Sequence, residues 1–127
     1  MDNCVFCGIK KAINEDRIIY EDDNWIAILD NYPVSDGHTL LISKQHYETY
    51  FNLPPYIQKD MYIIIQKIRC ELQERYNPDG WNIGCNCGEA AGQTVMHFHM
   101  HIIPRYKGDC ENPRGGVRGV IPSKQSY

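Results

Sequence analysis

The sequence predicts an α+β fold: a five-stranded antiparallel sheet with one long helix and a short helical or knuckle segment at the N-terminus. Short runs rich in β-branched and aromatic residues recur along the chain, with polar turn residues between them. Only the segment from Pro54 to about Tyr76 repeats apolar residues at steps of three and four, as an amphipathic helix does. The chain has 127 residues, 43% of them apolar and 23% charged, which is the balance of one globular core.

Each predicted strand is bounded by residues that break regular structure, such as Pro33, Gly37 and Pro104. The strands are expected at 17–21, 25–29, 38–43, 80–84 and 96–103. The helix presents one apolar face, formed by Ile57, Met61, Ile64, Ile65, Ile68 and Leu72. Residues 1–108 are therefore predicted to form one domain. Residues 109–127, with several glycines and few large apolar side chains, are predicted to form a C-terminal tail on the surface.

Charge and hydropathy exclude several classes of protein. Thirteen Lys and Arg against sixteen Asp and Glu give a formal charge of −3, so no basic surplus indicates a nucleic-acid partner. No apolar run approaches the roughly 18 residues that a membrane span needs, so no membrane association is expected. The first residues lack the pattern of a signal peptide, which favours a cytoplasmic location. In that reducing compartment the six cysteines are expected to be thiols or metal ligands.

Three of the five histidines, His97, His99 and His101, occur within five residues of a predicted strand. Because side chains alternate along a strand, all three are expected on one face at steps of roughly 6.5 to 7 Å. Phe98 and Met100 are expected to point to the opposite face and into the core. The histidine face is therefore the candidate site of chemistry.

Two kinds of chemistry use such a cluster. A metalloenzyme binds its metal through neutral imidazoles and ordinarily adds a carboxylate, for which Glu89 is the nearest candidate. A nucleophilic imidazole attacks phosphorus while a neighbouring acceptor holds its other ring N–H. The loop before the histidines, 86–94, offers backbone N–H groups, an amide and a hydroxyl to phosphate oxygens, which favours the second chemistry.

The chain resembles the histidine triad (HIT) family in three places. Residues 92–103, Gly-Gln-Thr-Val-Met-His-Phe-His-Met-His-Ile-Ile, are similar to its signature, in which histidines alternate with apolar residues after Gly-Gln-Ser/Thr. Residues 37–46 are similar to its second conserved block, and Cys4-x-x-Cys7 to its N-terminal element. The resemblance implies a HIT-like fold and a nucleotidyl hydrolase or transferase that passes a nucleoside monophosphate through a covalent histidine intermediate.

The resemblance also implies a role for each site residue. His99 is the nucleophile on the α-phosphorus, and His101 binds the nonbridging phosphate oxygens. His97 accepts a hydrogen bond from His99 through its backbone carbonyl, which fixes the tautomer of the nucleophile. The residues implied in substrate binding are Asp30, His38, Asn86, Gln93 and Thr94. Trp25, Ile28 and Tyr32 are candidates for the walls of a purine pocket.

A structural zinc ion is the implied cofactor. Family members with the N-terminal cysteine pair complete a tetrahedral site with two histidines, which match His46 and His97 here, so Cys4, Cys7, His46 and His97 are the expected ligands. Cys85 and Cys87 are weaker candidates as replacement ligands. No Mg²⁺ is expected, because histidine cations can stabilise the charge of the transition state.

The predicted function is cleavage of nucleoside phosphoramidates or dinucleoside polyphosphates at the α-phosphate. A purine nucleotide is the expected partner, together with a second copy of the chain in a homodimer. Two alternatives stay open: a nucleotide-binding regulator without turnover, and a metal-dependent hydrolase that uses the His-x-His-x-His cluster.

Overall fold

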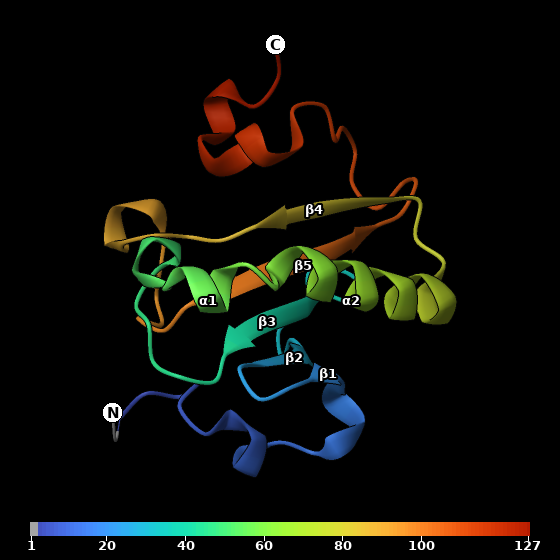
Figure 1. Cartoon of the computed structure of the whole chain (residues 1–127). Coiled ribbons are helices and arrows are strands. Elements are labelled where there is room, and N and C mark those ends of the chain that lie inside the picture. Colours follow the sequence, from blue (N-terminus) through green and yellow to red (C-terminus); the bar gives the residue numbers. More distant parts are fainter. Residues whose placement is uncertain (1–2) are drawn as a thin grey trace.

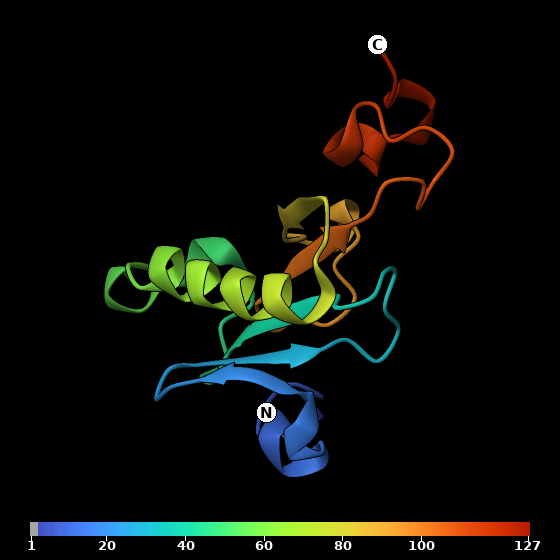
Figure 2. The same ribbon diagram turned by 90° about the vertical axis from the view of Figure 1, so that its right-hand side faces the viewer.

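The computed structural model describes residues 3–127 and confirms the predicted five-stranded antiparallel sheet with one long helix. The strands follow the order β1-β2-β3-β5-β4 across the sheet. Helix α2 lies along one face, as the two views in Figure 1 and Figure 2 show. The strands are β1 (Ile18–Glu21), β2 (Trp25–Leu29), β3 (Thr39–Ser43), β4 (Gly80–Gly84) and β5 (His99–Arg105).

The helical segment is interrupted once. The predicted single helix consists of α1 (Pro55–Gln58) and α2 (Met61–Tyr76). Asp60 separates them because its carbonyl already accepts the hydrogen bond of Ile64 and so begins a new helix. Asn77 ends α2 in the left-handed conformation, with φ of 51°, which asparagine tolerates better than most residues.

The two faces of the sheet carry separate apolar clusters. On the helix face, Trp25, Leu41 and Ile102 pack against Ile64 and Ile68 of α2. The opposite face carries a smaller cluster of strand residues, Ile26, Ile28, Leu40 and Ile42. It is covered by Phe6, Ile9 and Ile13 of the N-terminal segment and flanked by Ile18 of β1. The sheet is thus enclosed between a helix and an N-terminal segment, and the second layer borders the candidate site.

Strand β5 corrects the sequence prediction at both ends. It begins at His99, so His97 and Phe98 lie outside it, because the N–H of Phe98 donates to the carbonyl of Tyr47 instead of to a neighbouring strand. It also continues through Pro104, which was expected to stop it. Proline is tolerated there because the pairing of β5 with β3 ends at Ile102. Beyond that residue β3 offers no carbonyl that would have to accept a hydrogen bond from the N–H that proline lacks.

The remaining helical elements are short 3-10 turns: Ile9–Ala12, Glu15–Arg17, Tyr50–Asn52, Glu89–Ala91, η5 (Gly116–Val120) and η6 (Pro122–Lys124). The last two form the C-terminal tail, which lies beyond β4 at the end of the molecule opposite the N-terminus (Figure 1, Figure 2). The tail contacts the sheet through η5 and β4. The division of the chain at residue 108 stays a prediction.

Within residues 3–127, the structure contains no helix that is both long and apolar enough to cross a membrane. The cytoplasmic location predicted from the sequence stays a prediction.

Candidate active site

A hollow of about 790 Å³ lies between the sheet and the N-terminal segment and is called the main hollow here. His99 and His101 line it from β5, because both side chains point to the sheet face that carries Leu40 and Ile42. The rest of its wall is mostly apolar and includes Val5, Phe6, Ile9, Ile13, Ile28, Tyr32 and Leu40, with Arg17, Asp30, Asn31, Asn86 and Thr94 as polar members. Its size and lining suit a nucleoside.

The tautomer of His99 is fixed by one hydrogen bond. Its Nδ1 lies 2.8 Å from the backbone carbonyl oxygen of His97, and because a carbonyl can only accept, Nδ1 carries the proton. The other nitrogen, Nε2, therefore keeps a free lone pair. The ring of Phe6 packs edge-on against the imidazole, with 4.9 Å between ring centroids, and limits its movement. His99 thus has the arrangement that a nucleophilic imidazole needs.

His101 is the end of a hydrogen-bonded chain that the sequence did not predict. The backbone N–H of Val34 donates to Nδ1 of His38 over 3.1 Å, so the proton of the neutral His38 ring is on Nε2. That Nε2 lies 2.9 Å from Nδ1 of His101 and 3.4 Å from a carboxylate oxygen of Asp30. His38 donates to His101, which leaves His101 with its own proton on Nε2. His101 is therefore a hydrogen-bond donor at the main hollow.

Burial favours the neutral form of both histidines. The pKa of His38 is lowered from 6.5, chiefly because burial disfavours the charged ring, and Asp30 only partly opposes this. The pKa of His101 is lowered for the same reason, and further by the neighbouring His38 and His99. A neutral His101 still donates its proton to a phosphate oxygen, and it becomes able to hold a second proton when an anionic phosphate is near.

His97 lies on the same side of the sheet as His99 and His101, as the sequence predicted, because the ring of Phe6 contacts both His97 and His99. The ring of His97 is buried, and its Nδ1 lies 3.3 Å from Sγ of Cys4, 3.5 Å from Sγ of Cys7 and 3.1 Å from Nδ1 of His46. Phe98, between His97 and His99, packs on the helix face, so the alternation continues before the start of β5, while the ring of His97 is directed into the cysteine cluster. Only its backbone carbonyl serves His99.

Cys4, Cys7, His46 and His97 form the metal-ligand cluster expected from the sequence, with all four ligand atoms within 4.8 Å of one another. The donor set fits a tetrahedral zinc ion with two thiolates and two imidazoles. An observation independent of the spacing supports the fit: Nε2 of His97 donates to the carbonyl of Ser43 over 2.7 Å. That hydrogen bond leaves Nδ1 without a proton and aimed at the thiols, as a zinc-binding imidazole must be.

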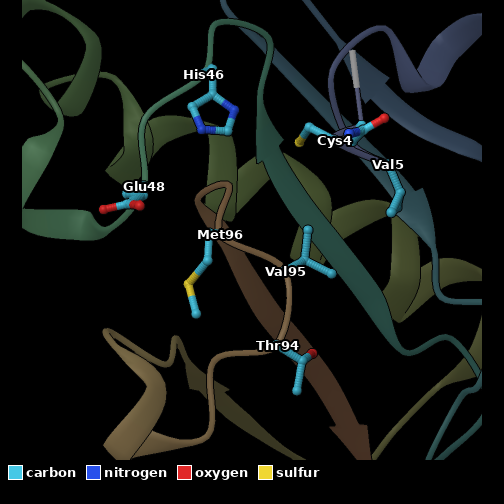
Figure 3. A pocket seen from close by; sticks show the side chains of 8 residues that line it. Cys4, Val5, His46, Glu48, Thr94, Val95 and Met96 are labelled. Carbon is cyan, nitrogen blue, oxygen red and sulfur yellow. The ribbon is translucent and has the colours of Figure 1, made fainter. Parts of the chain in front are cut away.

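A shallower hollow of about 510 Å³ lies beside this cluster (Figure 3). Cys4 and His46 border it on one side and Glu48 and Met96 on another, and Thr94 is common to it and the main hollow. Cys85 and Cys87, the possible replacement ligands, lie outside the cluster, with 3.9 Å between their Sγ atoms.

The loop residues predicted to bind substrate divide into two groups. Asn86 and Thr94 line the main hollow. Gln93 does not: its buried amide accepts from the N–H of Gly88 and donates to the carbonyls of Glu48 and Val95. Its hydrogen bonds are all directed at the backbone, so it shapes the loop that carries Thr94. Asp30 borders the main hollow, and His38 lies behind His101.

The purine-pocket candidates are also divided. Ile28 and Tyr32 line the main hollow, but Trp25 is buried on the helix face, where it packs against Phe98. Sequence reasoning missed Phe6 as a wall of the hollow. The position of Phe6 between Cys4 and Cys7 could have indicated this role. These two cysteines belong to the cluster that includes His97, and His97 is only two residues from His99.

Comparisons with known proteins agree with this geometry. Residues 11–108 match the model of the HIT domain. The fold is similar to that of a HIT family protein from Bacillus anthracis, with a TM-score of 0.77 and 42% identity, covering 85% of this chain and 77% of that chain. It is also similar to a zinc-bound histidine triad family protein from Mycobacterium smegmatis, with a TM-score of 0.75 and 41% identity, covering 85% and 78% respectively.

A relative with a named activity is adenylylsulfatase HINT3 of Arabidopsis thaliana. It is 39% identical over 109 residues, which are 86% of this chain and 55% of that protein. The fold and the paired histidines on β5 define a protein of the histidine triad class. With the domain match over most of its length, the chain belongs to the HIT family. That membership supports a nucleotide hydrolase or transferase.

The lowered pKa values predict how stability depends on pH. The unfolded chain binds protons on its histidines near pH 6.5, whereas folded His38 and His101 resist protonation. The contribution of these rings is therefore complete above about pH 6.5 and is lost as the pH falls below that value. We expect the melting temperature to fall between roughly pH 7.5 and pH 5.5, and to fall less in His38→Gln. Thermal denaturation measures both melting temperatures. An equal fall in the wild type and in His38→Gln would contradict the assigned neutral state of His38.

Proposed function

We propose that this protein cleaves nucleoside phosphoramidates or dinucleoside polyphosphates at the α-phosphate, through a covalent nucleotidyl intermediate on His99. The observation that carries the proposal is the 2.8 Å hydrogen bond from Nδ1 of His99 to the carbonyl of His97. It leaves Nε2 as an unprotonated nucleophile on the wall of a hollow of nucleoside size. A histidine that was only solvated would not need its tautomer fixed in this way.

In the first step, Nε2 of His99 forms a bond to the α-phosphorus as the bond from phosphorus to the leaving group breaks. With the anionic phosphate bound, His101 holds a second proton. The leaving group takes that proton, and His101 returns to the neutral ring that contacts His38. In the second step, water attacks the phosphorus, the bond between phosphorus and His99 breaks, and the proton of the water returns to His101. The products are a nucleoside monophosphate and the protonated leaving group.

No Mg²⁺ is assigned to either step. The N–H of His101 and the positive charge that develops on His99 as its bond to phosphorus forms offset the negative charge of the phosphate oxygens. Asn86 and Thr94, on the same hollow, supply an amide and a hydroxyl for the remaining oxygens. Asp30 is assigned to the ribose hydroxyls at the edge of the hollow.

The metal-dependent alternative predicts one metal on the three triad histidines. In the structure these histidines are separated: His97 belongs to the cysteine cluster, and His101 contacts His38 and Asp30. His99 belongs to neither of the ligand groups found within residues 3–127. Glu89, the predicted carboxylate ligand, is exposed and also lies outside both groups. This separation favours the nucleophilic reading.

A prediction about the reaction concerns the nucleophile. His99→Ala should lower the rate of phosphoramidate hydrolysis by several orders of magnitude and leave nucleotide affinity within about tenfold, because bond formation by His99 occurs only in the reaction and not in binding. Turnover is measured with adenosine 5′-phosphoramidate and affinity with AMP by calorimetry, with Cys70→Ala on the exposed side of α2 as the control. Near-normal turnover by His99→Ala would exclude the covalent mechanism. A wild-type protein that binds AMP but turns over none of the proposed substrates would favour the regulator instead.

We further propose one structural zinc per chain on Cys4, Cys7, His46 and His97. Zinc would cross-link the N-terminal segment to His46 and to His97, which lies just before β5. It would thereby hold Phe6 against His99. Chelation, or Cys4→Ser, should lower the melting temperature, and activity should fall only as far as the fold loosens. Turnover and melting are measured on the same chelated sample. Complete loss of turnover with an unchanged melting curve would show that the metal acts in the chemistry.

A homodimer is the last part of the proposal. Tyr56, Tyr62 and Ile63 are exposed apolar residues on α1 and α2, on the side away from the sheet, and they form a surface that a second copy could cover. Sedimentation equilibrium at micromolar concentration should give about twice the chain mass of 14.8 kDa. A mass of one chain would refute the dimer.

A further inference from the structure

A further hollow, called the tail hollow here, meets the main hollow at His101 and Asn86. It has a volume of about 380 Å³ and is lined by Asn82, Ile83, Gly84, Cys85, Asn86, His101, Ile103, Gly116, Val117, Gly119 and Val120. His101 and Asn86 line both hollows, so a phosphate between them would separate two substituents. If the nucleoside occupies the main hollow, the other substituent faces the tail hollow.

The tail hollow exists because of two features of the sequence. Gly84 pairs with His101 across β4 and β5, and no heavy atom lies within 4 Å of the position that a side chain there would take. Space therefore remains beside the imidazole. The tail then forms the other wall, where Val117 and Val120 stay 63% and 74% exposed although both are apolar. Two exposed valines beside the proposed proton donor suggest a ligand that covers them.

The charges around the tail hollow limit what it can bind. Apart from His101, its lining within residues 3–127 includes no acidic or basic side chain. Arg118, in the tail, donates to the carbonyls of Lys124 and Gln125 and stacks on the ring of Tyr127. Arg105 is held by both carboxylate oxygens of Asp109. Neither guanidinium is available to a polyphosphate or a sulfate.

We infer that the tail hollow receives the leaving group and favours an uncharged amine with an apolar substituent. The inference rests on the proposed function, because the hollow has this role only if His101 protonates a group that leaves the α-phosphorus. The apolar substituent would pack on Val117, Val120 and Ile103, while the amine nitrogen takes the proton of His101. A second nucleotide or a sulfate would enter a site without a free cation.

The test compares two substrates that differ only in the leaving amine: adenosine 5′-phosphoramidate and its N-benzyl derivative. Selectivity is the ratio of kcat/KM for the benzyl compound to kcat/KM for the unsubstituted one. Val117→Asp and Val120→Asp should each lower this ratio by about tenfold or more, because a carboxylate in an apolar subsite repels an apolar group. Val120→Ala should lower it by less. The matched control is Ile121→Asp, an exposed tail residue outside the hollow, which should leave the ratio and both rates unchanged.

An unchanged ratio in both aspartate variants, with wild-type turnover of the unsubstituted compound intact, would overturn the subsite and leave the proposed function standing. A wild-type preference for diadenosine tetraphosphate over the benzyl compound would also overturn it. Turnover that survives His99→Ala, or no turnover of either phosphoramidate by the wild type, would contradict the proposed function and the subsite together.

Discussion

The hydrogen bond between Nδ1 of His99 and the carbonyl of His97 is the interaction on which the rest of the site depends. It exists because His97 precedes β5 and turns its ring to the cysteine cluster, while its carbonyl stays directed at the strand. The same imidazole donates to Ser43 and faces Cys4 and Cys7. His97 therefore links the nucleophile, the end of β3 and the N-terminal segment. A change in the position of any one of these three would shift His97 and so alter its contacts with the other two.

The second histidine of the pair is controlled from a different part of the chain. His38 directs a proton to His101 because its own orientation is set by the backbone N–H of Val34, in the loop before β3. The two reactive nitrogens thus have opposite properties: a lone pair on His99 and a proton on His101. Their difference arises from backbone groups, which do not titrate, and it therefore persists over the pH range in which both rings are neutral.

Local pattern was enough for much of the fold. The β-branched and aromatic run of β2 and the period of three to four in α2 are carried by residues close together in the chain. β2 lies where it was predicted, and α2 ends where the single helix was predicted to end. The resemblance added the ligand cluster. The errors involve distant contacts: His97 alternates with Phe98 and His99 as a strand residue would, yet Tyr47 captures the N–H of Phe98. The contact between His38 and His101 spans 63 residues, and no local pattern predicts it.

The covalent intermediate is the central claim, and trapping it is the most direct test. Wild-type protein is mixed with excess adenosine 5′-phosphoramidate, quenched at neutral to basic pH with denaturant, digested and analysed by mass spectrometry. The proposed mechanism predicts an adenylyl group on the peptide that contains His99, attached to a ring nitrogen and lost in acid. An adenylyl group on a different residue while turnover continues would contradict the mechanism. Inversion of configuration at the α-phosphorus, which one direct displacement by water produces, would also contradict it.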